Sequence, residues 1–210
     1  MSPLRHPSEE VLVSRAAGRL SRGLALVVDA HLDACPVCRL QSAQWDAVGG
    51  ALLERLPPAE LSPDALARAM ARIERPAPAR IADAPPRGID LSAVLHGLRL
   101  GPRRPLAPGV WMRSVQGDHG RGQTYLLGSG AGRGLLRHGH AGAEFTCVLA
   151  GGYSDETGRY GPGDFAEADP DLVHTPKADP DGECVCLISS EGPMRMRSLI
   201  GRLLQPLFGV

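Results

Sequence analysis

The stretch that decides the fold is residues 132–151, which read GRGLLRHGHAGAEFTCVLAG. Within it His138 and His140 are two positions apart, and residues with this spacing in a β-strand point to the same face of the sheet. Glu144 follows after a short Ala-Gly-Ala connection, so its carboxylate can join the two imidazoles. This arrangement of side chains is typical of a metal site built on a β-strand.

The sequence around this stretch predicts a small all-β domain. Short apolar runs alternate there with turns rich in Gly, Asp and Pro, and the runs are too short and irregular for helices. The clearest of them cover residues 110–112, 123–127, 145–149 and 184–188. A sandwich or a barrel fits this length of chain.

The spacing Gly132-x5-His138-Gly-His140-x3-Glu144-x6-Gly151 resembles the first motif of the cupin family. The resemblance implies an all-β jelly-roll barrel that holds a metal ion. It also implies a further histidine ligand from a later hairpin.

The later histidine that matches is His174, eleven residues after Gly163. Asp169 and Asp171 stand where the family has Pro and Gly, and Ala178 replaces the usual Asn, which puts the turn geometry in question. The resemblance thus implies four ligands: His138, His140, Glu144 and His174. Three imidazoles and a carboxylate suit several divalent metals; we expect zinc, with manganese or iron as alternatives. A cupin fold without metal remains a competing interpretation.

Residues 1–74 predict four helices instead of strands. The first is capped by Ser8 and ends near Gly18, and the second is capped by Ser21. The third begins just after Cys35, with Pro36 in its first turn, and runs to about residue 56. The fourth opens at 62–64 and carries one apolar stripe, made by Leu66, Met70 and Ile73.

A second group of metal ligands lies in these helices. His31, Cys35 and Cys38 fall within eight residues at helical spacing, so they can converge where two helices meet. Thiolates and an imidazole together suit tetrahedral zinc, and the βαβ context of a redox CxxC site is missing. His6, by elimination, is the fourth candidate. Because so small a helical bundle can barely form a sufficient core, we expect this zinc to be structural.

A Pro-rich segment separates the two parts. The chain therefore divides into an all-α zinc-binding domain (1–75), a linker (76–88), a β domain (89–195) and a C-terminal tail (196–210). The fold class that we predict is α+β with two domains.

Composition excludes several functions. The 23 Lys and Arg residues balance 23 Asp and Glu residues, which argues against direct binding to DNA. No segment is apolar enough to span a membrane, and the N-terminus lacks the apolar core of a signal peptide. We therefore expect a cytoplasmic protein with reduced cysteines.

The remaining cysteines have different expected positions. Cys147 is an odd number of residues from Glu144, so it faces away from the metal. Cys184 and Cys186 share one strand face. They are either two small strand residues or an oxidisable pair near the metal, although this spacing suits a mutual disulfide poorly.

The pattern His31-x3-Cys35-x2-Cys38 after a short capped helix resembles the zinc-binding anti-sigma fold. Combined with a cupin, it resembles anti-sigma factors of the ChrR type. That resemblance implies a regulator and not an enzyme: the helices bind and inactivate an extracytoplasmic-function sigma factor, and the cupin releases it in response to singlet oxygen or related oxidants. The alternative is a cupin metalloenzyme, a dioxygenase or an isomerase, that acts on a small molecule.

Overall fold

The computed structural model describes residues 3–74, 98–117 and 122–196. The expected linker, 76–88, lies outside the described residues. So does the expected tail, apart from its first residue.

Four helices form the N-terminal part: α1 (Glu9–Ala16), α2 (Arg22–Ala34), α3 (Pro36–Glu54) and α4 (Ala65–Ile73). The side chains of Ser8 and Ser21 cap α1 and α2 as expected, by accepting hydrogen bonds from Val11 N and Leu24 N. The third helix starts at Pro36, directly after Cys35. The positions of the four predicted helices are thereby confirmed.

Thirteen strands, all paired antiparallel, form the rest of the described chain. A seven-stranded sheet has the order β1-β3-β4-β12-β6-β9, with β2 also paired to β3. Two three-stranded sheets have the orders β10-β5-β13 and β11-β7-β8. The strands of the large sheet are β1 (Arg99–Leu100), β2 (Arg104–Ala107), β3 (Val110–Gln116), β4 (Gln123–Ser129), β6 (Glu144–Ala150), β9 (Phe165–Ala168) and β12 (Cys184–Ser190). The small sheets contain β5 (His138–His140), β10 (Val173–His174), β13 (Met194–Met196), β7 (Tyr153–Asp155), β8 (Gly158–Tyr160) and β11 (Lys177–Ala178).

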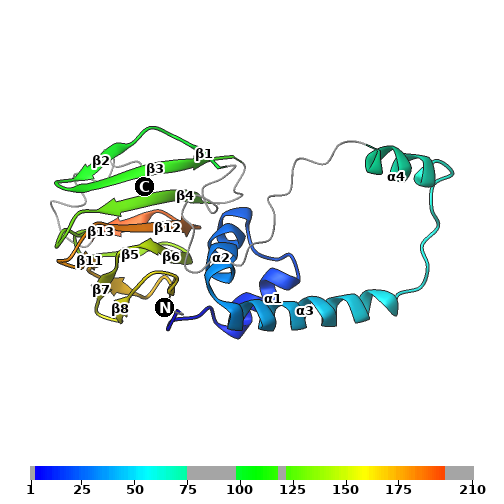
Figure 1. Ribbon diagram of the computed structural model, residues 1–210, viewed down its shortest axis with the longest axis horizontal. Coiled ribbons are helices and arrows are strands. Elements are labelled where there is room, and N and C mark those ends of the chain that lie inside the picture. Colours follow the sequence, from blue (N-terminus) through cyan, green and yellow to red (C-terminus); the bar gives the residue numbers. More distant parts are fainter. Residues whose placement is uncertain (1–2, 75–97, 118–121, 197–210) are drawn as a thin grey trace.

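The predicted closed jelly-roll barrel is not confirmed, because these strands form three separate sheets instead of one closed ladder. The small sheet that contains β5 lies over one face of the large sheet (Figure 1). Its strands are only two or three residues long, too short to continue the hydrogen bonding of the large sheet around a full circle. The coarser prediction, a cupin-like β domain, stands.

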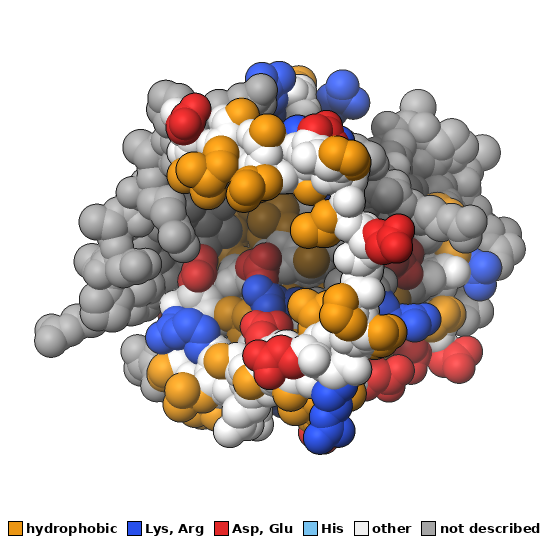
Figure 2. All heavy atoms as spheres, turned by 90° about the vertical axis from the view of Figure 1, so that its right-hand side faces the viewer, with side chains coloured by type: hydrophobic (Ala, Val, Ile, Leu, Met, Phe, Trp, Pro, Cys, Tyr) orange, Lys and Arg blue, Asp and Glu red, His pale blue; other side chains and the backbone are white. Residues whose placement is uncertain are grey.

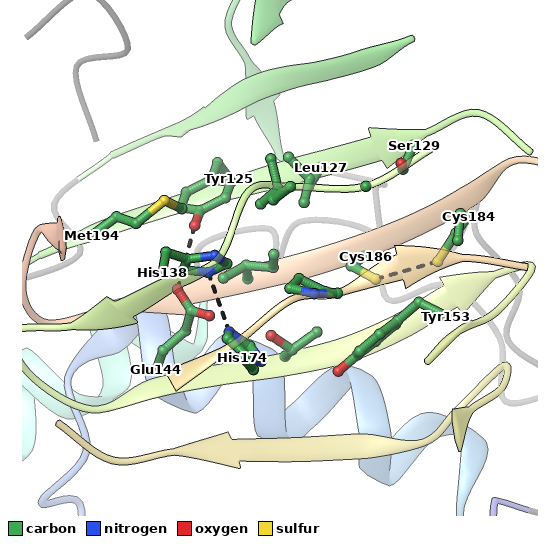
Figure 3. A pocket seen from close by; sticks show the side chains of 16 residues that line it. Tyr125, Leu127, Ser129, His138, Glu144, Tyr153, His174, Cys184, Cys186 and Met194 are labelled. Atoms are coloured by element: carbon green, nitrogen blue, oxygen red, sulfur yellow. Dashed lines mark hydrogen bonds between the residues drawn. The ribbon is translucent and has the colours of Figure 1, made fainter. Parts of the chain in front are cut away.

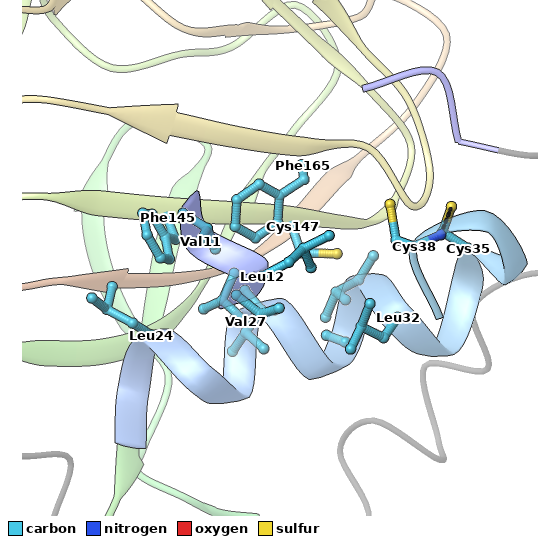
Figure 4. Close-up of a cluster of buried hydrophobic side chains, with 14 of the residues drawn as sticks. Val11, Leu12, Leu24, Val27, Leu32, Cys35, Cys38, Phe145, Cys147 and Phe165 are labelled. Atoms are coloured by element: carbon cyan, nitrogen blue, oxygen red, sulfur yellow. Dashed lines mark hydrogen bonds between the residues drawn. The ribbon is translucent and has the colours of Figure 1, made fainter. Parts of the chain in front are cut away.

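The predicted self-contained helical bundle is also not confirmed, because the helices share their core with the sheet. Helix α2 lies along the large sheet (Figure 1), and its fully buried Val27 and Val28 belong to the same apolar cluster as Phe145 and Leu187 (Figure 4). Strand β6 is buried on both faces, which a strand with one solvent-facing side cannot be. One sheet face is therefore covered by the helices.

The far end of α3 and all of α4 have no such cover in the described chain. No residue of α4 is buried, and α4 stands apart from the other helices (Figure 1). Among the described residues, no helix combines the length and apolar character that crossing a bilayer requires.

Candidate metal centres

The first ligand group, cluster 1, consists of His6, His31, Cys35 and Cys38. One ligand atom from each of the four lies within 4.8 Å of the others. Nδ1 of His6 is 3.5 Å from Sγ of Cys35 and 3.3 Å from Sγ of Cys38. His6 is exposed and the other three are buried, so the group opens to solvent on one side. All four residues singled out in the sequence come together here.

Local sequence explains how the helices place three of these ligands. Cys35 is both the C-cap of α2 and the N-cap of α3, and its extended backbone turns the chain between the two helices. Pro36 cannot donate an N–H inside a helix but fits the first turn of α3. The backbone N–H of Cys38 then points at Sγ of Cys35, 3.5 Å away.

The protonation of His31 in cluster 1 fits a bound cation. His31 donates from Nδ1 to the carbonyl oxygen of Gly163 at 2.7 Å, and its buried Nε2 has no hydrogen-bond partner. Burial lowers the pKa of His31, so this nitrogen presents a lone pair. Burial and the neighbouring Cys35 raise the pKa of Cys38 to about 12. An orphaned lone pair beside two buried sulfurs is costly unless a metal ion is bound there.

The second ligand group, cluster 2, consists of His138, His140 and His174, all buried. Strand β5 lies between β10 and β13, and its register sets His138 directly opposite His174. Nε2 of His174 is 3.1 Å from Nε2 of His140 and 3.2 Å from Nε2 of His138. The three rings therefore aim the same nitrogen at one point.

Hydrogen bonds on the far side of two of the rings fix the orientation of His138 and His174. Nδ1 of His138 donates to the Leu136 carbonyl oxygen at 2.8 Å, and Nδ1 of His174 donates to Asp155 at 2.8 Å. Burial lowers the pKa of His138 to about 4, so its Nε2 is a lone pair at neutral pH. The lone pairs of His138 and His174 converge and repel one another, whereas a cation at the centre of the three rings would bind all three. Cluster 2 also fits a metal ion.

Glu144, the fourth expected ligand, lies next to this group and not within it. One oxygen of its carboxylate is 3.4 Å from Nδ1 of His140 and accepts a hydrogen bond from the Tyr125 hydroxyl, also at 3.4 Å. Burial, with the charge of Glu144 as a further cause, raises the pKa of Tyr125. The role of Glu144 as a metal ligand stays a prediction.

A mostly apolar cavity of about 50 Å³ adjoins cluster 2. In Figure 3, His138, Glu144 and His174 face one another near one end, and Cys184 and Cys186 lie toward the other. The two sulfurs are 3.7 Å apart, on a strand whose register shifts at Cys186. Both cysteines line the cavity, as expected for a shared strand face. Cys147 lies in the core on the helix side of the sheet, which confirms that it points away.

The unusual aspartates of the second motif form a turn of their own. Asp169 accepts hydrogen bonds from the backbone N–H groups of Asp171 and Leu172, at 2.9 and 2.8 Å. This Asx-type turn replaces the expected Pro and Gly, and His174 still reaches cluster 2.

Sequence reasoning missed the residues that support the ligands. Asp155 holds His174, Tyr125 contacts Glu144, and the carbonyl group of Gly163 holds His31. No spacing signals Asp155 or Tyr125, because each reaches its partner only through strand packing. Gly163 marks the start of the second motif in the sequence, but no sequence pattern signals its contact with a distant helix.

The fold and these sites define a class: a cupin-like β domain joined to N-terminal helices, with one Cys/His group in the helices and one His group in the sheets. Comparison with known proteins narrows the class. The model of the ChrR cupin-like domain matches residues 101–194. The chain is 40% identical, over the full length of both proteins, to the anti-sigma-E factor ChrR of Cereibacter sphaeroides.

A solved structure agrees with the sequence comparison. A chain in the crystal structure of Rhodobacter sphaeroides SigE in complex with the anti-sigma ChrR is 37% identical, with a TM-score of 0.74. The match covers 89% of this chain and 98% of that one. This chain belongs to the ChrR family of anti-sigma factors. Membership in a family of regulators agrees with the prediction that the chain is not an enzyme.

Proposed function

We propose that this chain binds an extracytoplasmic-function sigma factor through its helices, keeps it inactive, and releases it under oxidative stress. The similar solved structure is a complex of the anti-sigma factor ChrR with the sigma factor SigE. Since sigma factors act on RNA polymerase, the proposed function places the chain in the cytoplasm.

The observation that carries the proposal is the apolar surface that α3 and α4 leave uncovered. Leu66 and Ile73 of α4 are 75% and 76% exposed, and Leu52, Leu53 and Leu56 at the end of α3 are also exposed. Figure 2 looks at this end of the molecule, where apolar side chains gather on both sides of a hollow. Exposed apolar patches of this kind mark protein-binding surfaces. The apolar surfaces of α3 and α4 suit a partner that is enclosed between these two helices.

Zinc is the ion proposed for cluster 1, because two sulfurs and two imidazoles match its preferred ligand set. Residues 1–75 would then be a zinc-binding domain whose metal stabilises the helices that contact the partner. For cluster 2 we propose a divalent metal, zinc first and manganese or iron as alternatives. Glu144 would complete that set by moving toward the three imidazoles.

The β domain, residues 89–195, is the proposed sensor of singlet-oxygen-type stress. Its support is chemical: Cys184, Cys186 and the imidazoles of His138 and His174 are oxidisable groups that line one cavity. Sensing is tested in cells that carry a reporter of the sigma factor, with singlet oxygen from a photosensitiser. In cells with Cys184→Ser/Cys186→Ser the reporter should remain repressed. In cells with Cys147→Ala, a substitution on the opposite face of the sheet, the reporter should be induced. A normal response of the double variant contradicts a sensory role for the pair.

Partner binding is tested by calorimetric titration of the purified chain with its sigma factor. Leu66→Ala/Met70→Ala/Ile73→Ala should weaken binding at least about 100-fold, since anchoring side chains at interfaces contribute about 1–2 kcal/mol or more each. Arg72→Ala, on the polar face of α4, is the matched control. Equal affinity of both variants contradicts the proposed surface.

A further inference from the structure

The turn that joins β8 to β9, residues 161–164, contacts both segments that carry histidines of cluster 1. On one side lies the N-terminal strap, residues 3–8. Leu4 N and Arg5 N donate to Oδ1 of Asp164 at 2.6 and 3.0 Å, and the N–H of Phe165 donates to the Arg5 carbonyl oxygen at 3.1 Å. The next residue of the strap is His6. The position of that ligand is therefore set by the β domain.

On the other side of the turn lies α2. The carbonyl oxygen of Gly163 accepts the hydrogen bond from His31, and the φ angle of Gly163 is +90°. A Cβ atom at this position would lie 2.7 Å from Cγ of Pro3 and 3.2 Å from Cβ of Ala34. The turn is thus wedged between the strap and α2, and only glycine fits there without displacement.

Strand β8, which leads into this turn, forms a hairpin with β7, and the far end of that hairpin supports cluster 2. Asp155, the last residue of β7, accepts the hydrogen bond from His174 and another from the backbone N–H of Thr157 at 2.8 Å. The Thr157 hydroxyl lies 2.7 Å from that of Tyr160, where β8 ends and the turn begins. Arg5 of the strap reaches back, with its guanidinium 5.1 Å above the Tyr160 ring and 3.3 Å from the Thr157 carbonyl oxygen.

We propose that residues 155–164 are a coupling element that transmits the state of cluster 2 to cluster 1. When the coordination of His174 changes, Asp155 moves, the hairpin shifts, and the turn loosens its hold on His6 and His31. This inference rests on the proposed function for its biological meaning, since it explains how a sensor in the sheets reaches the helices that hold the partner.

The test measures the accessibility of Cys35 and Cys38 in the full chain, purified with zinc and without the sigma factor. N-ethylmaleimide labels the cysteines, and mass spectrometry of peptides gives the rate at each one. Because supporting hydrogen bonds contribute about 10- to 100-fold to metal affinity, Gly163→Ala should accelerate labelling of both residues about 10-fold. Gly132→Ala is the matched control: its φ is also positive, at +64°, but nothing lies within 4 Å of the added Cβ.

The coupling itself is tested from the other end of the hairpin. His174→Ala should accelerate labelling of Cys35 and Cys38 about 5-fold, at the low end of typical coupling between sites. In the double variant His174→Ala/Gly163→Ala, the rate should equal that of Gly163→Ala alone. An unchanged rate in His174→Ala, or effects that multiply, overturns the proposal.

Two further variants keep the test decisive if Gly163→Ala does not fold, as judged by its circular dichroism. Arg5→Ala removes only the contacts of one exposed side chain and should raise the labelling rates less, in the same direction. Asp155→Asn should reproduce His174→Ala. Unchanged rates in both overturn the proposal. Because no sigma factor is present, the coupling can fail while partner binding survives, and the reverse result is equally distinguishable.

Discussion

The two ligand groups are assembled in different ways. Cluster 1 takes three of its ligands from the short junction of α2 and α3 and a fourth from the strap, and it opens to solvent at His6. Cluster 2 joins β5 to a histidine 34 residues later and is buried throughout. A ligand group that ties local segments together at the surface suits a role in holding helices. An enclosed one beside a cavity suits detection of small reactive molecules.

Removing each metal in turn tests whether the two clusters have separate roles. Cys35→Ser/Cys38→Ser should abolish binding of the sigma factor, because a structural zinc ion contributes about 10 kcal/mol or more to folding. His138→Ala/His140→Ala should weaken the affinity only about 5-fold, since coupling between two sites is about 1 kcal/mol at the low end of its usual range. Calorimetric titration measures both. Equal losses in the two variants would mean that the clusters do not have separate roles.

A stability measurement compares the core that α2 shares with the large sheet and the exposed apolar surface of α4. Phe165, 2% exposed, packs against the ring of His31 and belongs to the cluster that joins α2 to the sheet (Figure 4). Phe165→Ala should lower the free energy of unfolding by about 3–5 kcal/mol. Leu66→Ala should change it by less than about 0.5 kcal/mol, because that side chain is on the surface. Urea unfolding of both variants provides the measurement, and a small loss for Phe165→Ala contradicts the shared core.

Acid should lower the stability of the protein by protonating His138 in the buried cluster 2. The pKa of His138 is lowered to about 4 in the folded protein from 6.5, so unfolding takes up a proton between these values. The stabilisation is complete above pH 6.5 and is lost as the pH falls toward 4. Between pH 7 and pH 5 the free energy of unfolding of metal-free protein should fall by about 2 kcal/mol.

His138→Gln is the control for that prediction. Its pH dependence over the same range should be flatter than that of the unaltered chain, as measured by urea unfolding at each pH. A slope that the substitution leaves unchanged would assign the effect to other groups.

The smallest expected effect concerns the N-terminus of α2. Ser21 accepts a hydrogen bond from Leu24 N at 3.4 Å, and Ser21→Ala should cost about 1 kcal/mol of stability. Since α2 carries both His31 and the apolar face that meets the sheet, the loss should appear in the unfolding of the whole chain. A separate, earlier transition of the helices would indicate that the two parts unfold independently. Differential scanning calorimetry distinguishes the two outcomes.

Features carried by neighbouring residues could be predicted from the sequence. The caps Ser8 and Ser21, the break at Pro36, the group His31–Cys35–Cys38 and the pair His138 and His140 all follow from helical or strand spacing. The resemblance to cupins supplied His174. The shared core could not be inferred in the same way, because helical periodicity shows an apolar face but not what covers it.

One signal for that core is present in the sequence. Residues 144–149 are all buried in strand β6, and the mostly apolar run that they form indicates a strand covered on both faces. The contacts of Gly163 and Asp155 left no comparable signal. They depend on how the β8–β9 turn meets the strap and α2, which is a property of the assembled fold.

The central claim is that each cluster binds its own metal ion and that cluster 1 still retains its ion, more loosely held, when the ligands of cluster 2 are removed. Native mass spectrometry of the intact, freshly purified chain tests it most directly. We expect the mass of the chain plus two metal ions, with one ion lost in Cys35→Ser/Cys38→Ser and the other lost in His138→Ala/His140→Ala. A metal-free mass for the unaltered chain, or loss of both ions in the histidine variant, would contradict it.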